Sequence, residues 1–385
     1  MNINFIKYSV VLWLLFCSTI FSQENDFNFT LQGQASAWLT VVPEKSFISQ
    51  AGLRYIPDLF IEAPLSNSLF LDAELSINTY LATDIHDWKT ENETAKLKAY
   101  RGWLRLSTNQ FEVRAGLQKI NFGSATLFRP LKWFDTIDPR DPLALTEGVY
   151  GILTRYYFED NTNIWLWGLY DNSDIKGWEI IPTEDNGIEF GGRFQTPLFT
   201  GEAGLTYHHR KADLSKTPSL AVLSNERYVN ENRYAFDGKW DVEIGLWFEG
   251  AVIQREIDIS SLKYQRMLTT GADYTFNVGN GLHVLSEFFN TENSDKFLGN
   301  GEVVNFVGFS VDYPVGLFDN VSAFYYRDWT NEDNYFTLTW QRTYDNWIIY
   351  LLGFFNPKTA SLNQTQSGNN ALAGDGFQIM VVFNH

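Results

Sequence analysis

Hydrophobic and polar residues alternate at every second position along most of the chain. From Phe27 to Val41 the odd positions are apolar or small, and most of the even positions are polar. The same alternation returns from Leu69 to Asn78. A period of two over this many residues predicts β-strands with one apolar and one polar face.

Runs of this kind recur about eighteen times, and short and long connections alternate between them. That alternation is typical of transmembrane β-barrels, which have tight turns at one end and long loops at the other. We therefore predict an all-β fold, a single closed antiparallel transmembrane barrel of about eighteen strands, with about sixteen as the alternative. The predicted strands begin near Phe27, Phe47, Leu69, Leu97, Phe111, Val149, Ile164, Ile188, Gly201, Arg233, Leu246, Tyr264, Leu282, Val303, Val321, Tyr335, Trp347 and Gly376.

A secreted β-sandwich is the competing fold, because it shares the period of two. Its strands are shorter, however, at about five to six residues with a turn every eight to twelve or so. Several runs in this chain are about twice that length. The long runs therefore favour the barrel.

The N-terminal residues have the pattern of an export signal. Lys7 precedes the apolar block Tyr8–Ile20, and Ser22-Gln23 is a candidate cleavage point. We predict a signal peptide over 1–22, a barrel over 23–385, and a location in the cell outer membrane. The single cysteine, Cys17, falls within the signal, so no disulfide framework is expected in the mature chain.

Charge and composition narrow the range of partners. The formal net charge is −17, which argues against nucleic acid as a partner and predicts a mild preference for cations. No later stretch approaches the length of a spanning apolar helix. The expected partners are outer-membrane lipid and small hydrophilic solutes. No cofactor is expected, and assembly into a homo-oligomer stays open.

The connection Asn121–Glu147 is too long for a turn and rich in aromatic and charged residues. Its three X-Pro steps disfavour both a strand and a long helix. A connection of this length in a compact fold is usually functional or disordered, and its aromatic content argues against disorder. We predict that 121–147 is the third outer loop and folds into the barrel, where it narrows the pore.

The sequence around this loop resembles porin-like outer-membrane barrels, including alginate-export-like proteins. Arg114, Gly116, Gln118, Asn121, Phe122 and Gly123 match a strand motif of the form R-x-G-x-Q-x-x-N-[WF]-G, and the segment Asp138–Pro142 reads D-P-R-D-P. The architecture is also similar to that of general porins, in which the third loop forms the constriction. This resemblance implies a channel without naming its solute.

The candidate constriction residues are the charged, amide and aromatic side chains of this loop and of the predicted strands beside it. Charged side chains are costly against lipid, so we expect them to face the lumen. Arginines on the strands facing carboxylates on the loop would set a transverse field that screens solutes by charge. The alternative interpretation is that the same pairs only fix the loop to the wall, without selecting solutes. The candidates are Arg101, Arg105, Arg114, Gln118, Arg129, Lys132, Trp133, Asp135, Asp138, Arg140, Asp141, Glu147 and Arg155.

Aromatic residues leave further interpretations open. Phe128, Trp133 and Phe134 suit a stacking surface for sugar rings, but such residues more often anchor a loop. Candidates for the aromatic girdles at the membrane interfaces, with packing inside the lumen as the other assignment, are Trp38, Trp165, Trp167, Trp240, Trp340 and Trp347.

Two other functions are alternatives to a channel. In a secretion or surface-assembly barrel the inner loop would serve as a seal. An outer-membrane lipid-modifying enzyme needs a serine–histidine pair on one face, and His283 and Ser286 are three apart, hence on opposite faces of a strand. Neither a Gly-x-Ser-x-Gly nor a His-Glu-x-x-His motif occurs. We therefore predict that the protein is not an enzyme.

Overall fold

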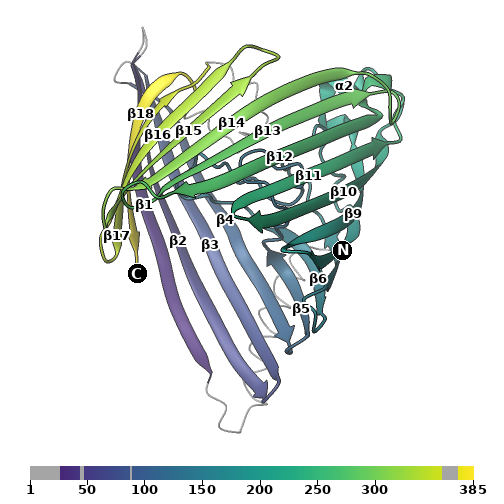
Figure 1. The fold of residues 1–385 in the computed structure, drawn as a ribbon, viewed down its shortest axis with the longest axis horizontal. Helices are drawn as coiled ribbons and strands as arrows, with labels where there is room; N and C mark the ends of the chain where they lie inside the picture. The colour runs from purple at the N-terminus through teal and green to yellow at the C-terminus, as the bar shows by residue number, and fades with distance from the viewer. Residues whose placement is uncertain (1–26, 44–46, 87–88, 358–371) are drawn as a thin grey trace.

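The computed structural model describes residues 27–43, 47–86, 89–357 and 372–385, and the predicted signal 1–22 lies outside them. The described residues form eighteen strands, two 3₁₀ turns and one short helix (Figure 1). The first nine strands are β1 Asn28–Pro43, β2 Phe47–Ser66, β3 Leu69–His86, β4 Lys89–Ser107, β5 Phe111–Gln118, β6 Val149–Tyr157, β7 Asn163–Tyr170, β8 Ile188–Leu198 and β9 Gly201–Asp213. The remaining elements are η1 Leu214–Lys216, α2 Pro218–Ala221, β10 Tyr228–Val242, β11 Ile244–Arg255, η2 Ser260–Leu262, β12 Tyr264–Phe276, β13 Leu282–Ser294, β14 Glu302–Pro314, β15 Asp319–Asp328, β16 Asn334–Thr343, β17 Trp347–Phe355 and β18 Asp375–Asn384.

The eighteen strands form one closed antiparallel sheet. Each strand pairs with the strands before and after it in the chain, and β1 closes the ring by pairing with β18 from Gln34↔Asn384 to Val41↔Phe377. The prediction of a closed all-β barrel with eighteen strands is thus confirmed. Because the ring closes, every strand has a hydrogen-bonded neighbour on both sides.

The two faces of the sheet differ in polarity as the period of two predicts. On β6, Tyr150 and Ile152 point outward and are 50% and 55% exposed, whereas Val149 and Leu153 point inward and are buried. Phe377 and Ile379 on β18 are likewise exposed on the outside. The inner face also holds most of the buried charged side chains, so the barrel has an apolar exterior and a polar, largely filled interior.

Connection lengths follow the predicted alternation, with one clear error. Tight turns such as 108–110 lie at the end of the barrel that holds the C-terminus, and the long connections 119–148 and 171–187 lie at the other end. The fourth strand was predicted to begin near Leu97, but β3 continues to His86 and β4 begins at Lys89. Hydrogen bonds to the neighbouring strand keep this polar stretch extended even though it lacks apolar alternation.

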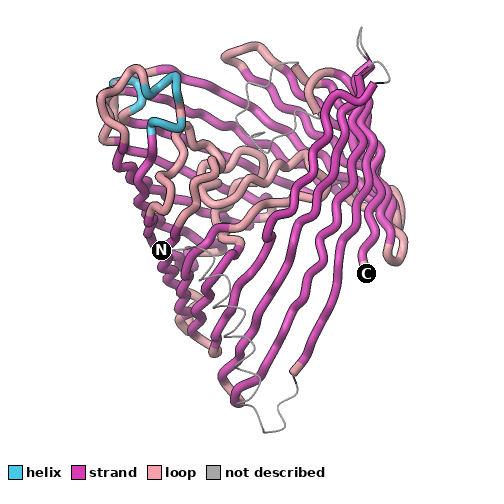
Figure 2. The backbone as a smooth tube through the Cα atoms, turned by 180° about the vertical axis from the view of Figure 1, so that it is seen from behind, coloured by secondary structure: helices cyan, strands magenta, loops and turns pink. Residues whose placement is uncertain are grey.

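Strand β5 ends early, and this places the long loop. The pairing of β4 with β5 stops at Gly102↔Leu117, so residues 89–101 of β4 continue beyond the end of β5. The chain leaves the wall after Gln118 and returns to it at Val149. Figure 2 shows loop segments lying within the ring of strands. In the described part of the chain, no helix has both the length and the apolar composition needed to cross a bilayer.

Candidate functional site

The segment 119–148, which joins β5 to β6, is bound to the opposite side of the barrel. Glu287 on β13 accepts hydrogen bonds from the backbone N–H groups of Thr126 (2.6 Å), Leu127 (2.9 Å) and Phe128 (2.7 Å). Its carboxylate also accepts the indole N–H of Trp247 at 2.9 Å. One buried carboxylate therefore satisfies three consecutive backbone donors of a segment that no neighbouring strand supports.

Glu249 on β11 forms the second attachment. It accepts the backbone N–H of Ala125 at 2.6 Å and that of Leu131 at 3.2 Å. Gly123 has a φ of +99°, and a Cβ there would lie 2.3 Å from the Glu249 carboxylate. Only glycine accepts both that backbone conformation and that close approach. The glycine of the N-F-G sequence thus lets the loop reach Glu249.

Phe128 anchors the same part of the loop through its ring. The side chain is fully buried, with ring centroids 5.7 Å from Phe289, 5.6 Å from Phe306 and 5.1 Å from Tyr326. A Cβ on Gly308 would lie 2.7 Å from the Phe128 ring, so the glycine on β14 leaves room for it. Since Phe128 has no exposed face, the structure shows it as an anchor and not as a stacking surface.

A second aromatic group packs the beginning of the loop against β7 and β9. Phe122 stacks on Trp167 at 5.7 Å and contacts Trp133 and Phe134 edge-on at 5.8 Å. Trp133 and Phe134 are 3% and 2% exposed, so both serve as anchors in this structure. Trp167 therefore faces the lumen. Among the girdle candidates, Trp38 and Trp165 also point inward, where Arg54 and Arg155 respectively lie over their rings.

The charged residues of the loop mostly pair with one another. Arg129 bonds Asp135 at 3.0 Å and also donates to the side chain of Asn121. Arg140 holds Asp138 at 2.8 Å. The guanidinium of Arg140 keeps the pKa of the Asp138 carboxyl below its usual value, although burial alone would raise it. These pairs stabilise the folded shape of the loop, and they are not directed at the wall.

The predicted arginines of the wall lie together on the inner faces of β4, β5 and β6. Arg105 pairs with Asp72 at 2.7 Å, and Arg155 pairs with Glu112 at 3.0 Å. The guanidinium of Arg114 lies 4.4 Å from the ring centroid of Trp103. The wall arginines that form ion pairs therefore pair with carboxylates on neighbouring strands of the wall.

The end of the loop contacts strand β4 through a hydrogen bond and an ion pair, and the predicted rings of facing charges are not formed by ion pairs in the part of the chain that the structure describes. Arg101 donates to the backbone oxygen of Thr146 at 3.1 Å, and Glu147 pairs with Lys98 at 3.0 Å. Within the described residues, none of the wall arginines forms an ion pair with a carboxylate of 119–148. Asp141 accepts the backbone N–H of Leu143 at 3.0 Å. The Gln118 amide donates to the backbone at Arg114 and Gly151 and so fixes the end of β5.

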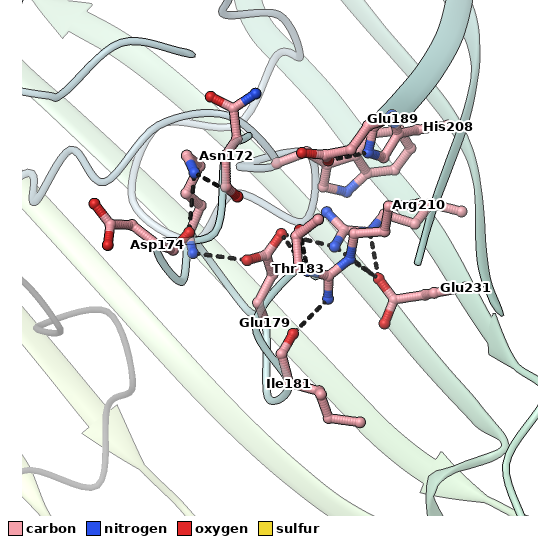
Figure 3. Close-up of polar contacts among 12 residues, drawn as sticks. Asn172, Asp174, Glu179, Ile181, Thr183, Glu189, His208, Arg210 and Glu231 are labelled. Atoms are coloured by element: carbon pink, nitrogen blue, oxygen red, sulfur yellow. Dashed lines mark hydrogen bonds and ion pairs between the residues drawn. The ribbon is translucent and has the colours of Figure 1, made fainter. Parts of the chain in front are cut away.

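A second inward segment, 171–187 between β7 and β8, was not anticipated from the sequence. Glu179 in this segment pairs with Arg233 on β10 at 2.8 Å and with Arg210 on β9 at 3.3 Å (Figure 3). Glu231 on β10 holds Arg210 at 2.6 Å and Arg255 on β11 at 2.6 Å. All five side chains are at most 5% exposed. The sequence showed only a set of charged residues on the three neighbouring strands β9, β10 and β11.

The histidine beside this network is also fully engaged. His208 is completely buried between Glu189, at 3.1 Å from its Nε2, and the indole N–H of Trp167, at 3.2 Å from its Nδ1 (Figure 3). The indole can only donate, so Nδ1 accepts and Nε2 carries the proton toward the carboxylate. Both ring nitrogens are used for structure, and this histidine has no position from which to act on a solute.

Lys132 makes the loop sensitive to alkaline pH. Burial lowers the pKa of its ammonium group from 10.5 to about 8. Between these values the unfolded chain binds more protons than the folded chain, so the free energy of unfolding should increase as pH rises through this interval. The full increase would be roughly 3 kcal/mol. Lys132→Met should remove it, and urea unfolding in lipid vesicles on both sides of this interval measures it. Equal pH slopes for the two proteins would contradict the assignment.

Searches with the sequence gave no match to a protein-family model and none to a curated protein. The fold, by contrast, has many solved counterparts. OmpT of Vibrio cholerae, an outer membrane protein solved in a trimer form, aligns with a TM-score of 0.51 at 11% identity and covers 93% of this chain and 99% of its own. The fold is that of an outer-membrane β-barrel of the porin type. OccAB1 of Acinetobacter baumannii aligns with this barrel at a TM-score of 0.53 and 11% identity, covering 93% and 96% of the two chains. OmpF of Salmonella typhi, in complex with daunomycin, aligns with a TM-score of 0.50 at 13% identity and covers 95% of this chain and 99% of its own.

Proposed function

We propose that the protein is an outer-membrane channel through which small hydrophilic solutes diffuse passively, with the pore narrowed by segment 119–148. The observation that carries this proposal is the attachment of the segment to Glu249 and Glu287. Strand β5 and strand β13 lie eight positions apart in a ring of eighteen, so a segment that starts at one and bonds the other spans the lumen. A spanning segment reduces the cross-section open to water.

The location in the outer membrane has separate support. The exterior of the barrel carries rows of exposed aliphatic and aromatic side chains, which suit contact with lipid. The structural similarity to outer-membrane barrels agrees with this, and so does the export pattern over 1–22. One of the similar proteins was solved as a trimer form, so a homo-oligomer belongs to the proposal and chemical cross-linking in native membranes tests it.

A transport role is preferred over catalysis because neither His208 nor His283 is placed beside a serine on the outer face. His208 is enclosed, and His283 lies beside Asp273 at 3.1 Å on the inner face. Ser286 is on the opposite face of β13 from His283, since three residues separate them. A lipid-modifying site would need these groups together on the outer face.

Planar-bilayer recording of the purified protein tests the channel. We expect stepwise ion currents, together with swelling of proteoliposomes in sugars at rates that fall as the sugar becomes larger. The second candidate is a barrel of a secretion or surface-assembly system, which is favoured by the bonding of two inward segments, 119–148 and 171–187, to side chains of the inner wall. If repeated preparations of correctly folded protein gave no current steps, the open channel would be rejected and the sealed barrel would remain.

A further inference from the structure

Several cations on the inner faces of β2, β4 and β5 have no carboxylate within ion-pair distance among the described residues. Arg54 lies over the rings of Trp38 and Tyr80, with centroids at 5.5 Å and 5.2 Å. Lys96 is exposed and forms neither an ion pair nor a hydrogen bond in the described part of the chain. We call Arg54, Lys96, Arg101 and Arg114 the cationic strip. In a chain with a net charge of −17, such a group of cations without ion pairs is unexpected.

A β-bulge places this strip on one face of β4. Lys98 and Arg101 are three residues apart, so a regular strand would point them to opposite sides. The register with β3 shifts between Ser76↔Arg101 and Ile77↔Ala99, which leaves Tyr100 as the extra residue. The bulge therefore turns Lys96 and Lys98 to the same side as Arg101. This side is the inner one, because Lys96 is paired with the buried Tyr80.

The outer part of the strip borders a cavity of about 590 Å³, a size within the usual range for small-molecule sites. Strands β2, β3 and β4 contribute Arg54, Asn78 and Lys96 to its lining, and residues 171–176 also line it. In the strand register, Tyr80 on β3 lies opposite Arg54 on β2 and opposite Lys96 on β4. Their backbones are therefore about 10 Å apart, so the two long side chains can both contact one small ligand.

None of the acidic groups that line the cavity forms an ion pair with Arg54 or Lys96, and Asp141 of the loop acts on Arg54 only through space, beyond ion-pair distance. Glu147 is bound to Lys98 at 3.0 Å, and Asp174 lies 3.9 Å from the same ammonium. The carboxylate of Asp171 accepts the backbone N–H of Asn186 at 3.0 Å. Elsewhere in the lumen, acidic side chains that contribute to the negative net charge form ion pairs, such as Asp237 with Arg193 at 2.6 Å. The negative net charge is therefore a poor guide to the charge that a solute meets here.

Two details of Arg54 suit an oxyanion. Its Nε atom is buried and has no acceptor within the described protein. Trp38 and Tyr80 lie beside the guanidinium, with ring centroids 5.5 Å and 5.2 Å from its central carbon, and no described carboxylate lies within ion-pair distance of it. The planar fork of N–H donors on an arginine matches the two oxygens of a carboxylate or phosphate group.

We propose that this cavity binds small organic or inorganic oxyanions, carboxylates or phosphates, between Arg54 and Lys96. The inference deepens the proposed channel function, because it assigns the class of solute that the outer half of the pore selects. Binding should also weaken as ionic strength rises, since the contacts are charged and only partly buried.

Titration calorimetry of the purified barrel with succinate and with inorganic phosphate tests the site. We expect saturable binding of at least one of them, and the tighter ligand identifies the preferred group. Arg54→Gln and Lys96→Gln should each weaken it by at least about tenfold, as expected for loss of a charged hydrogen bond. Lys89→Gln removes the same charge from β4 outside the cavity and should leave affinity unchanged. Because Lys96 is exposed, its variant keeps the test valid even if Arg54→Gln fails to fold.

The outcomes also separate this site from the channel itself. Calorimetry needs no open pore, so binding that depends on Lys96 supports the site even if bilayers show no current. Current steps without saturable binding of either anion would overturn the site and leave the channel. Equal affinity in the Lys96→Gln and Lys89→Gln proteins would overturn it as well.

Discussion

Excising residues 124–144 and joining the ends with a short Gly-Ser linker should raise single-channel conductance by about twofold or more, because conductance follows the cross-section of the aqueous path. The excised residues include the backbone donors that reach Glu287 and the ring of Phe128. Without them, the part of the segment bound to the far wall is gone. Planar-bilayer recordings of both proteins under the same salt gradient give the comparison.

A milder change addresses the same point without shortening the chain. Phe128→Ala removes a fully buried ring, a change that typically costs about 3–5 kcal/mol. We expect the segment to detach part of the time, so that large openings and cleavage by added protease both increase. Phe199→Ala is the matched control, since Phe199 is 92% exposed in a turn at the opposite end. Unchanged conductance in both the excision and the Phe128→Ala protein would show that the segment does not narrow the pore.

Glu231→Gln should lower the free energy of unfolding by about 3–5 kcal/mol, because removing one member of a buried charge cluster leaves the other charges uncompensated. Glu231 is fully buried and contacts three guanidinium groups, those of Arg210 and Arg255 at 2.6 Å and that of Arg233 at 2.7 Å. Urea unfolding in lipid vesicles, followed by the mobility shift of the heat-denatured band, measures the loss.

The control for this prediction is a change of the same chemistry at the surface. Glu226 is exposed, and Glu226→Gln should stay within about 0.5 kcal/mol of the original protein. A Glu231→Gln protein as stable as this control would mean that the cluster does not hold β9, β10 and β11 together. Because Glu179 bonds two of the same arginines, we also expect Glu231→Gln to expose segment 171–187 to protease.

Strand positions followed closely from the pattern of residues. The predicted starts at Leu69, Phe111, Val149 and Ile188 coincide with those of β3, β5, β6 and β8. The largest miss was β4, predicted from Leu97 but starting at Lys89. Its first residues are polar on both faces and exposed, so they carry no periodic signal. Pairing with β3 alone keeps them extended.

The site was only partly accessible from the sequence. The long loop was recognised from its length, prolines and aromatics, but no sequence pattern identified Glu249 and Glu287 as its attachment points. The bulge at Tyr100 was also invisible, because nothing in the sequence shows where a strand gains a residue against its partner. The inward course of segment 171–187 was not anticipated, because it depends on Glu179 meeting Arg210 on β9 and Arg233 on β10.

The sequence by itself determined that this chain forms strands, which side of each strand is apolar, and that the strands close into a barrel. These properties depend on the period of two, which is present in the sequence of each strand whatever its register with a partner. Only the tertiary structure decided which charges meet. Glu231 lies opposite both Arg210 and Arg255, and Asp72 lies opposite Arg105, because of the register that turns and closure impose on neighbouring strands. Register is a property of pairs of strands, so no single strand's sequence encodes it.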